Sequence, residues 1–193
     1  MQVIQDFFDE DVYKKLERLF LDPLFDWHYT SPTATLTDDQ GLDTGEPMDD
    51  NYMFAHTFYH AMEDGFTIIS PYMQEFIEPT LWAIKNTLGF SDPIKIKAGM
   101  YTNQGKVNRT GVHTDFPEYT LKGMGVYTTM VYHINDNNGS TVVVTESTGG
   151  LMYRAEIPQK ANQMVVFDGS KEHYGTTHTD TKVRLVLNYN MMM

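Results

Sequence analysis

The clearest alternation of apolar and polar positions lies within residues 163–190, where two apolar runs flank a polar turn. In the second run the odd positions are apolar and include Leu185 and Leu187, whereas the even positions include Arg184 and Asn188. Side chains alternate between the two faces of a strand. The pattern therefore predicts two strands, the second with one core face and one face that carries an arginine.

The first half of the chain shows helical spacing instead. Asp9 precedes apolar residues that recur three and four positions apart, which predicts a capped helix over 10–20 that ends before Pro23. A second amphipathic pattern predicts a helix over 71–88, closed by Gly89. The segment between these helices has no apolar period over 30–51, and we interpret it as a long loop.

From residue 94 onward the chain consists of short strand-like runs. They are predicted at 94–102, 125–134, 141–146, 151–156, 163–168 and 181–190. Between the second and third runs, Asn138-Gly139 predicts a hairpin.

Helices followed by many short strands predict a mainly β fold with flanking helices. We expect a sandwich or jelly roll with the N-terminal helices packed on one sheet. The length suits a single domain over 1–193, with a helical and loop flank over 1–93 and a β core over 94–193.

Composition excludes several classes of function. The chain has no cysteine, so it forms neither disulfides nor thiolate metal sites. It lacks both a signal-peptide pattern and an apolar run near the roughly 20 residues that span a bilayer, so we expect no membrane association and a cytoplasmic protein. The net charge of −12 makes nucleic acid an unlikely partner, because an acidic surface repels phosphates.

A metal site is the strongest candidate chemistry. His113 and Asp115 are two positions apart, so in an extended segment both side chains point to one side. With His173 they would supply two histidines and one carboxylate, the set that binds non-haem Fe(II). The alternative is an exposed pair at the end of a strand. We prefer His173 to His178 as the distal ligand because His178 lies in a threonine-rich turn that we expect to be solvated.

Arg184 is the second candidate. Its planar guanidinium binds carboxylates through two parallel hydrogen bonds and stays charged at any working pH. An arginine that faces a sheet interior needs an anionic partner, since an unpaired buried charge is costly. The partner is either a ligand or an acidic residue of the chain itself.

These residues carry a resemblance to a known family. The chain resembles the 2-oxoglutarate/Fe(II)-dependent oxygenases, especially small single-domain, prolyl-hydroxylase-like forms from bacteria and phages. The resemblance spans most of the second half of the chain. Its segments are His113-Thr114-Asp115, Tyr132-His133-Ile134-Asn135 leading into Asn138-Gly139, Phe167-Asp168 before His173, and Arg184 through Asn190.

The resemblance implies a double-stranded β-helix and a set of roles. Fe(II) would be bound by His113, Asp115 and His173, and 2-oxoglutarate would bind through its keto-acid end to iron and through its far carboxylate to Arg184. With O2 as the third reactant, the usual products are succinate, CO2 and a hydroxylated substrate. One departure is Val186, where relatives often have a serine beside the arginine, so another hydroxyl or donor must assist.

Two further cosubstrate contacts follow from the same resemblance. Tyr101 is on the predicted strand before the metal loop, where relatives place a tyrosine. His133 stands where a second such tyrosine is found, and it is either a donor to the far carboxylate or a core histidine. If it is a donor, cosubstrate affinity should rise below about pH 7, because histidine titrates near neutrality.

The substrate is not specified by these residues. We expect a peptide side chain or a small molecule, in the cytoplasm of a bacterium or of a phage-infected cell, with the oligomeric state undetermined. The competing interpretation is a non-catalytic, metal-binding jelly roll. A cupin fits less well because the chain has no His-x-His pair.

Overall fold

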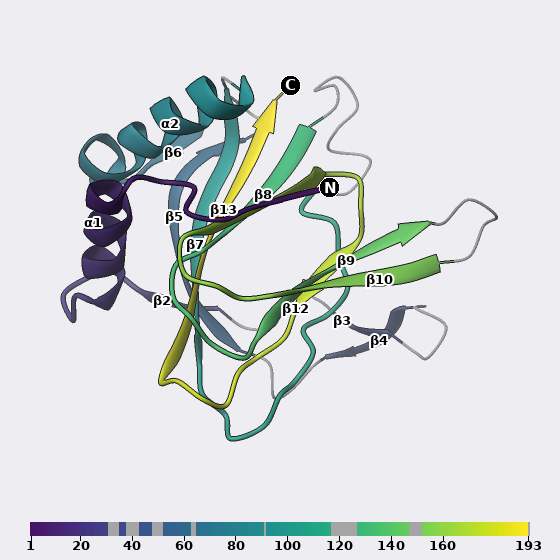
Figure 1. Cartoon of the computed structure of the whole chain (residues 1–193). Coiled ribbons are helices and arrows are strands. Elements are labelled where there is room, and N and C mark those ends of the chain that lie inside the picture. The colour runs from purple at the N-terminus through teal and green to yellow at the C-terminus, as the bar shows by residue number, and fades with distance from the viewer. Residues whose placement is uncertain are drawn as a thin grey trace.

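The computed structural model describes residues 1–30, 35–37, 43–47, 52–62, 65–90, 92–116, 127–146 and 152–192. The described strands form sheets of 8, 3 and 2 strands (Figure 1). In chain order the elements are β1 (Gln2–Ile4), α1 (Glu10–Leu21), β2 (His28–Thr30), β3 (Thr35–Thr37), β4 (Asp43–Pro47), β5 (Met53–Ala61), β6 (Thr67–Ile69), the π-helix η1 (Met73–Ile77), α2 (Glu78–Leu88), β7 (Pro93–Thr102), β8 (Tyr127–His133), β9 (Ser140–Glu146), β10 (Met152–Pro158), β11 (Gln163–Asp168), β12 (His173–Gly175) and β13 (Val183–Met192).

Both expected helices form. The Asp9 side chain accepts a hydrogen bond from the backbone N–H of Val12 at 2.9 Å and caps α1. The second helix begins as a π-helical turn and becomes α-helical at Glu78, with Pro79 in its first turn. It ends at Gly89, whose φ of 82° is the left-handed conformation that glycine adopts without strain.

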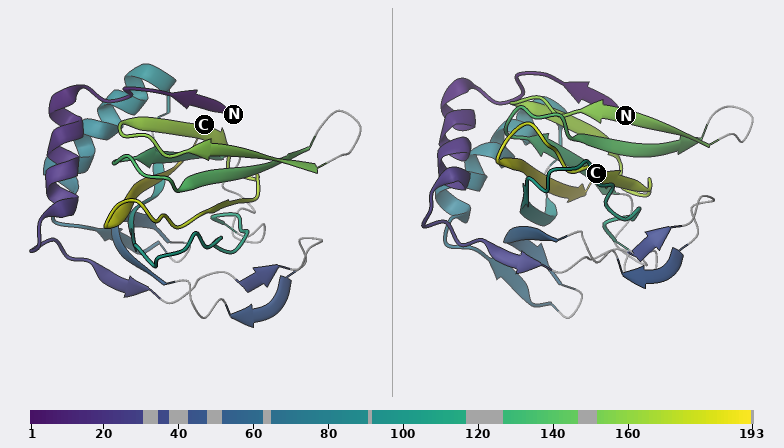
Figure 2. Two further views of the ribbon diagram at one scale, coloured as in Figure 1. Left: turned by 60° about the horizontal axis from the view of Figure 1, so that its bottom comes forward. Right: turned by 90° about the horizontal axis from the view of Figure 1, so that it is seen from below.

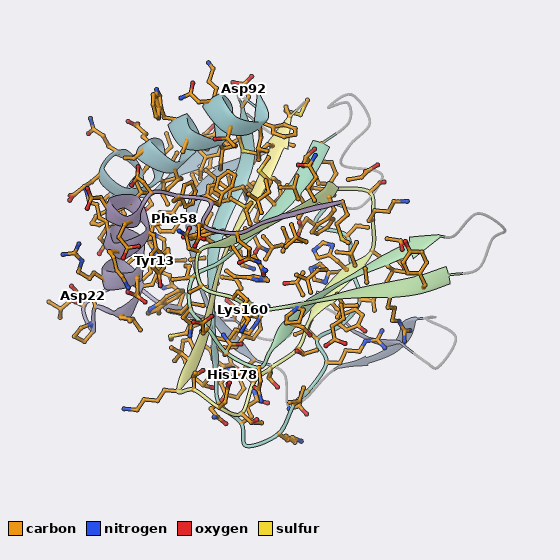
Figure 3. The ribbon with its side chains drawn as sticks, viewed as in Figure 1. Tyr13, Asp22, Phe58, Asp92, Lys160 and His178 are labelled. Carbon is orange, nitrogen blue, oxygen red and sulfur yellow. The ribbon has the colours of Figure 1, made fainter. Side chains whose placement is uncertain are left out.

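The large sheet has the strand order β1-β11-β8-β13-β7-β5-β2, with β6 on β5, and every pairing is antiparallel. The helices pack on one face of this sheet (Figure 2). Phe58 and Tyr13 are among the buried side chains of that layer (Figure 3), and Tyr189 donates a hydrogen bond to Thr80 of α2 at 2.7 Å. The expectation of helices on one sheet is therefore confirmed.

The second sheet, β10-β9-β12, packs against the other face of the large sheet. Its Val143 and Ile157 join Val131, Phe167 and Val186 of the large sheet in a second apolar cluster. The chain is thus mainly β, with a helix-covered layer on one side of the large sheet and a smaller sheet on the other.

Three expectations were wrong. The flank over 1–93 is not only helix and loop, because it contributes β1, β2, β5 and β6 to the large sheet. The Asn138-Gly139 segment makes no hairpin, because β8 pairs with β11 and β13 while β9 pairs with β10 and β12. This segment crosses from one sheet to the other. The expected loop over 30–51 contains a two-stranded sheet, β3 with β4. The rest of that loop lies outside the described residues.

Within the described part of the chain, no helix has the length and apolar character needed to cross a membrane.

Candidate metal and cosubstrate site

The two histidines of the candidate site are brought together by a backbone bridge. His113 follows β7 and His173 begins β12, and each donates its backbone N–H to the carbonyl of the other, at 3.0 and 2.9 Å. The ring centroids consequently lie 4.6 Å apart. Residues sixty positions apart in the sequence therefore present neighbouring imidazoles.

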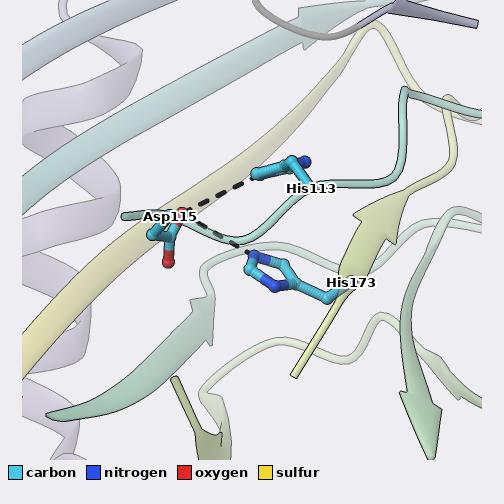
Figure 4. A group of neighbouring side chains, drawn as sticks. All are labelled: His113, Asp115 and His173. Atoms are coloured by element: carbon cyan, nitrogen blue, oxygen red, sulfur yellow. Dashed lines mark ion pairs between the residues drawn. The ribbon is translucent and has the colours of Figure 1, made fainter. Parts of the chain in front are cut away.

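Asp115 completes the group (Figure 4). Its Oδ1 lies 3.8 Å from Nε2 of His113 and 3.7 Å from Nε2 of His173. One candidate ligand atom from each of the three residues lies within 4.8 Å of the other two. His173 Nε2 is buried and has no hydrogen-bond partner. An orphaned nitrogen beside a second imidazole and a carboxylate fits a divalent metal of the Fe(II) type.

The surroundings of the histidines orient them for this role. Nδ1 of His113 lies 3.0 Å from the carbonyl of Gly111, and Nδ1 of His173 lies 3.1 Å from that of Lys171. A carbonyl only accepts, so each Nδ1 carries the proton and each Nε2 keeps its lone pair for a metal.

The carboxylate is held in the same way. Oδ2 of Asp115 accepts hydrogen bonds from Asn190 at 2.7 Å and from Thr129 at 3.1 Å, which leaves Oδ1 facing the histidines. Burial alone would raise the pKa of Asp115, but the nearby imidazoles of His173 and His113 and the hydrogen bond from Asn190 hold it well below its usual range. The group is therefore a permanent anion at neutral pH.

Arg184 lies inside the molecule and has no acidic partner among the residues that the structure describes. Its side chain is 2% exposed, and none of the ion pairs among the described residues involves it. Nη2 makes only long contacts of 3.3 Å, to the carbonyl of Ser140 and to Oγ1 of Thr141, and Nε has no partner. The guanidinium lies 5.3 Å from the ring centroid of Tyr101. The interpretation of Arg184 as half of an internal salt bridge is wrong for the described part of the chain.

Two glycines make room for this arginine. A Cβ on Gly139 would lie 2.9 Å from Cδ of Arg184, and a Cβ on Gly175 would lie 3.3 Å from Nη1. The glycine that predicted a hairpin is therefore needed for close approach to a side chain. Its φ is not positive, unlike that of Gly89.

His133 is fully buried behind this group. Its Nδ1 lies 2.7 Å from Oε1 of Gln163 and its Nε2 lies 2.8 Å from Oγ1 of Thr141. Burial, reinforced by repulsion from Arg184, lowers its pKa to about 3. The expected rise in cosubstrate affinity below pH 7 therefore has no basis in His133, which stays neutral.

His178 is placed differently from our expectation. Its side chain has no solvent exposure, whereas Thr179 and Asp180 of the same turn are exposed, so the prediction of a solvated turn was wrong for His178 itself. Its buried neighbour Thr177 donates from Oγ1 to the carbonyl of Lys106 at 3.0 Å and accepts from the backbone N–H of Asn108 at 2.7 Å. His178 is nevertheless absent from the metal-ligand group.

A single cavity joins the metal group to the arginine. It is bordered by all three ligand candidates, by Arg184 and Tyr101, and by side chains that our sequence analysis did not select. Those additional residues include Lys95, Lys97, Thr141, Asn188 and Asn190. The alternation of the two strands contained a signal for Lys97 and Asn188, which share faces with Tyr101 and Arg184. Nothing in the sequence marked Thr141.

Comparison with known proteins rests on structure. No family model and no curated relative matches the sequence. A 2OG-Fe(II) oxygenase family protein from Burkholderia pseudomallei superposes with a TM-score of 0.70 at 10% identity, over 98% of this chain and 84% of that one.

Two further structures show the range of this fold. A prolyl hydroxylase from Trichoplax adhaerens, in complex with a hypoxia inducible factor peptide fragment, has a TM-score of 0.55 at 11% identity over 99% of this chain and 83% of that one. The epimerase SnoN from nogalamycin biosynthesis, in complex with Fe3+, alpha ketoglutarate and nogalamycin RO, has a TM-score of 0.57 at 15% identity over 98% and 77%. The resemblance drawn from the sequence extends to the whole architecture: this chain has the fold of the 2-oxoglutarate/Fe(II) oxygenases.

Proposed function

We propose that the chain is a non-haem Fe(II)- and 2-oxoglutarate-dependent dioxygenase, an oxidoreductase built as a single domain over 1–193. Its two packed sheets would be the double-stranded β-helix of that family. The observation that carries the proposal is the cavity in which a His-Asp-His group occurs together with the buried Arg184, whose guanidinium has no acidic partner in the described part of the chain. A chain with only a structural metal would have no need for the arginine, whose burial without an anion is costly.

In this proposal His113, Asp115 and His173 would hold Fe(II). Bound iron and 2-oxoglutarate supply the oxidising chemistry, which ends in succinate, CO2 and oxidised substrate. The chain contributes geometry. Backbone carbonyls fix the two imidazoles, and Asn190 with Thr129 fixes the carboxylate, so the ligand atoms converge before any metal arrives.

Arg184 would bind the far carboxylate of 2-oxoglutarate with its guanidinium fork. Tyr101 lies close enough to help, and burial raises the pKa of its phenol, so the hydroxyl keeps its proton and can donate. Thr141 lines the cavity beside the arginine, and its Oγ1 accepts a hydrogen bond from Nη2 of Arg184, so it would help to hold the guanidinium in place.

His133 would act through Thr141 and not by direct contact. The Gln163 carbonyl requires a proton on Nδ1, so Nε2 accepts the Thr141 hydroxyl proton and turns the oxygen lone pairs toward Arg184. In this role His133 would hold Arg184 in place through Thr141. The family resemblance had instead suggested that His133 donates directly to the cosubstrate carboxylate.

The substrate would be a peptide side chain or a small molecule, the two classes bound in the Trichoplax and SnoN structures. Hydroxylation is the reaction we expect. The net charge of −12 argues against nucleic acid.

Oxygen-dependent conversion of 2-oxoglutarate to succinate tests the proposal. We expect Fe(II)-loaded protein to produce succinate and the Asp115→Ala variant to produce none. Bound iron without succinate formation, in the presence of O2 and of a broad panel of peptides and small molecules, would favour the non-catalytic metal-binding domain instead.

A further inference from the structure

The cavity has a second polar pair that neither the metal nor the cosubstrate uses. Lys97 of β7 and Asn188 of β13 are register partners, four residues along each strand from the Tyr101–Arg184 pair. At about 3.3 Å per residue the two pairs are separated by about 13 Å along the strands. Both Lys97 and Asn188 line the cavity.

Neither member of this pair has a partner in the described part of the chain. Oδ1 of Asn188 is buried and accepts no hydrogen bond. The Lys97 side chain is in none of the ion pairs or hydrogen bonds found among the described residues; burial and repulsion from Lys95 lower its pKa, and the charge of Asp115 opposes that effect. Lys95, the next residue on the same face of β7, forms no ion pair with any residue that the structure describes, and its Nζ lies 5.9 Å from the ring centroid of Phe116.

The proposed cofactors leave the pair unmatched. Asp115 would be committed to the metal, the keto-acid end of 2-oxoglutarate would also be on the metal, and its far carboxylate would be on Arg184. The Lys97 ammonium and the Asn188 carbonyl oxygen, which come from paired positions of two neighbouring strands, would then both lack a partner among the described residues. A cation beside an unfilled acceptor complements a ligand that carries a carboxylate next to an N–H group.

We propose that Lys97 and Asn188 bind the substrate to be oxidised, through a carboxylate on Lys97 Nζ and an adjacent N–H on Asn188 Oδ1. The inference rests on the proposed oxygenase function and narrows its substrate to an α-amino acid or the C-terminal residue of a peptide. Both sources offer the same carboxylate and N–H. In this arrangement β7 and β13 position the substrate on the Asp115 side of the cavity, away from Arg184.

The test uses the full chain loaded anaerobically with Mn(II) and 2-oxoglutarate, so that binding is measured without turnover. The probes are the free L-amino acids, their N-acetyl derivatives as mimics of a peptide C-terminus, and the corresponding C-terminal amides. We expect at least one acid to bind by isothermal titration and its amide to bind at least about tenfold more weakly. Binding of free or of N-acetylated acids identifies which source supplies the substrate.

The variants are Lys97→Met and Lys97→Gln, with Lys85→Met on the exposed face of α2 as the matched control. Both Lys97 variants should bind 2-oxoglutarate within about twofold of wild type and lose the preference for acid over amide, whereas Lys85→Met should keep it. The unchanged cosubstrate affinity also shows that the variants are folded.

Three results would overturn the assignment. The first is that none of the acids tested binds. The second is that both Lys97 variants still prefer the acid to the amide. The third is that replacing Lys97 abolishes 2-oxoglutarate binding, which would assign the lysine to the cosubstrate. Failure of 2-oxoglutarate to bind the wild-type protein at all would instead refute the proposed function itself.

Discussion

The two faces of β13 differ in whether their buried groups have partners among the described residues. On the odd face, Leu185 and Leu187 are completely buried and pack with residues of the helix-covered core. On the even face, Arg184 and Asn188 carry buried polar atoms that have no partner in the described chain. The same ten-residue strand therefore has one face that packs within the protein and one whose unpartnered atoms a ligand would satisfy in the proposed function.

This difference separates stability from function along a single strand. Apolar burial on the odd face stabilises the fold directly. The unpaired groups on the even face are a cost to the ligand-free protein, and a ligand that satisfies them stabilises the folded state by mass action. Substitutions on the odd face should therefore lower the stability of the fold, whereas substitutions on the even face should weaken ligand binding.

The largest effect is expected at the metal group. His113→Ala, Asp115→Ala and His173→Ala should each abolish succinate formation and lower metal content, while the unfolding temperature without metal falls little. His28→Ala, on the exposed strand β2, should retain activity. If the three variants retained wild-type metal content, the ligand assignment would be wrong.

On the opposite face, Leu187→Ala should reduce the free energy of unfolding by about 2–5 kcal/mol, because it leaves a cavity in a fully buried site. The folded fraction should still bind 2-oxoglutarate normally. Leu24→Ala is the matched control, since that side chain is 83% exposed. Denaturant unfolding measures both, and equal changes in the two variants would contradict the packing shown here.

Arg184→Lys keeps the charge but loses the fork, so 2-oxoglutarate should bind about tenfold more weakly or worse while Mn(II) still binds. Arg18→Lys, at an exposed position of α1, serves as the control. If the Arg184→Lys variant bound 2-oxoglutarate as tightly as the wild type, Arg184 would not be the residue that binds the cosubstrate carboxylate.

The smallest effect concerns His133. Its pKa of about 3 in the folded state lies below the ordinary value, so the unfolded chain binds the proton more readily and stability falls with pH below about 6.5. Relative to His133→Gln, the wild type should lose about 1.2 kcal/mol between pH 6 and pH 5. A difference that stays constant over this interval would mean that His133 is protonated in the fold.

Most of the long helices and strands, and the metal-ligand candidates of the site, could be predicted from the sequence. Periodicity located α1, α2 and the strands of the second half, because each has enough residues to show a period. β12, with three residues, and the β3–β4 pair were too short and too polar to show one. The Asn138-Gly139 hairpin was wrong because that glycine serves the packing of Arg184, a long-range contact.

For the site too, local features could be predicted from the sequence and long-range contacts could not. Spacing of two positions made His113 and Asp115 neighbours, and alternation marked the cavity face of β13. The backbone bridge between His113 and His173 depends on how distant segments pair, so the sequence alone did not contain it. Thr177, the buried neighbour of His178, likewise makes its hydrogen bonds to residues about seventy positions earlier.

Anaerobic titration of 2-oxoglutarate, with and without Mn(II), tests the cavity face of β13 most directly. We expect wild-type protein to bind the cosubstrate with Mn(II) and to bind it at least about tenfold more weakly without metal or in Asp115→Ala, because one end of the ligand then loses its anchor. Equal affinity in all three titrations would show that the His-Asp-His group and Arg184 do not form one site.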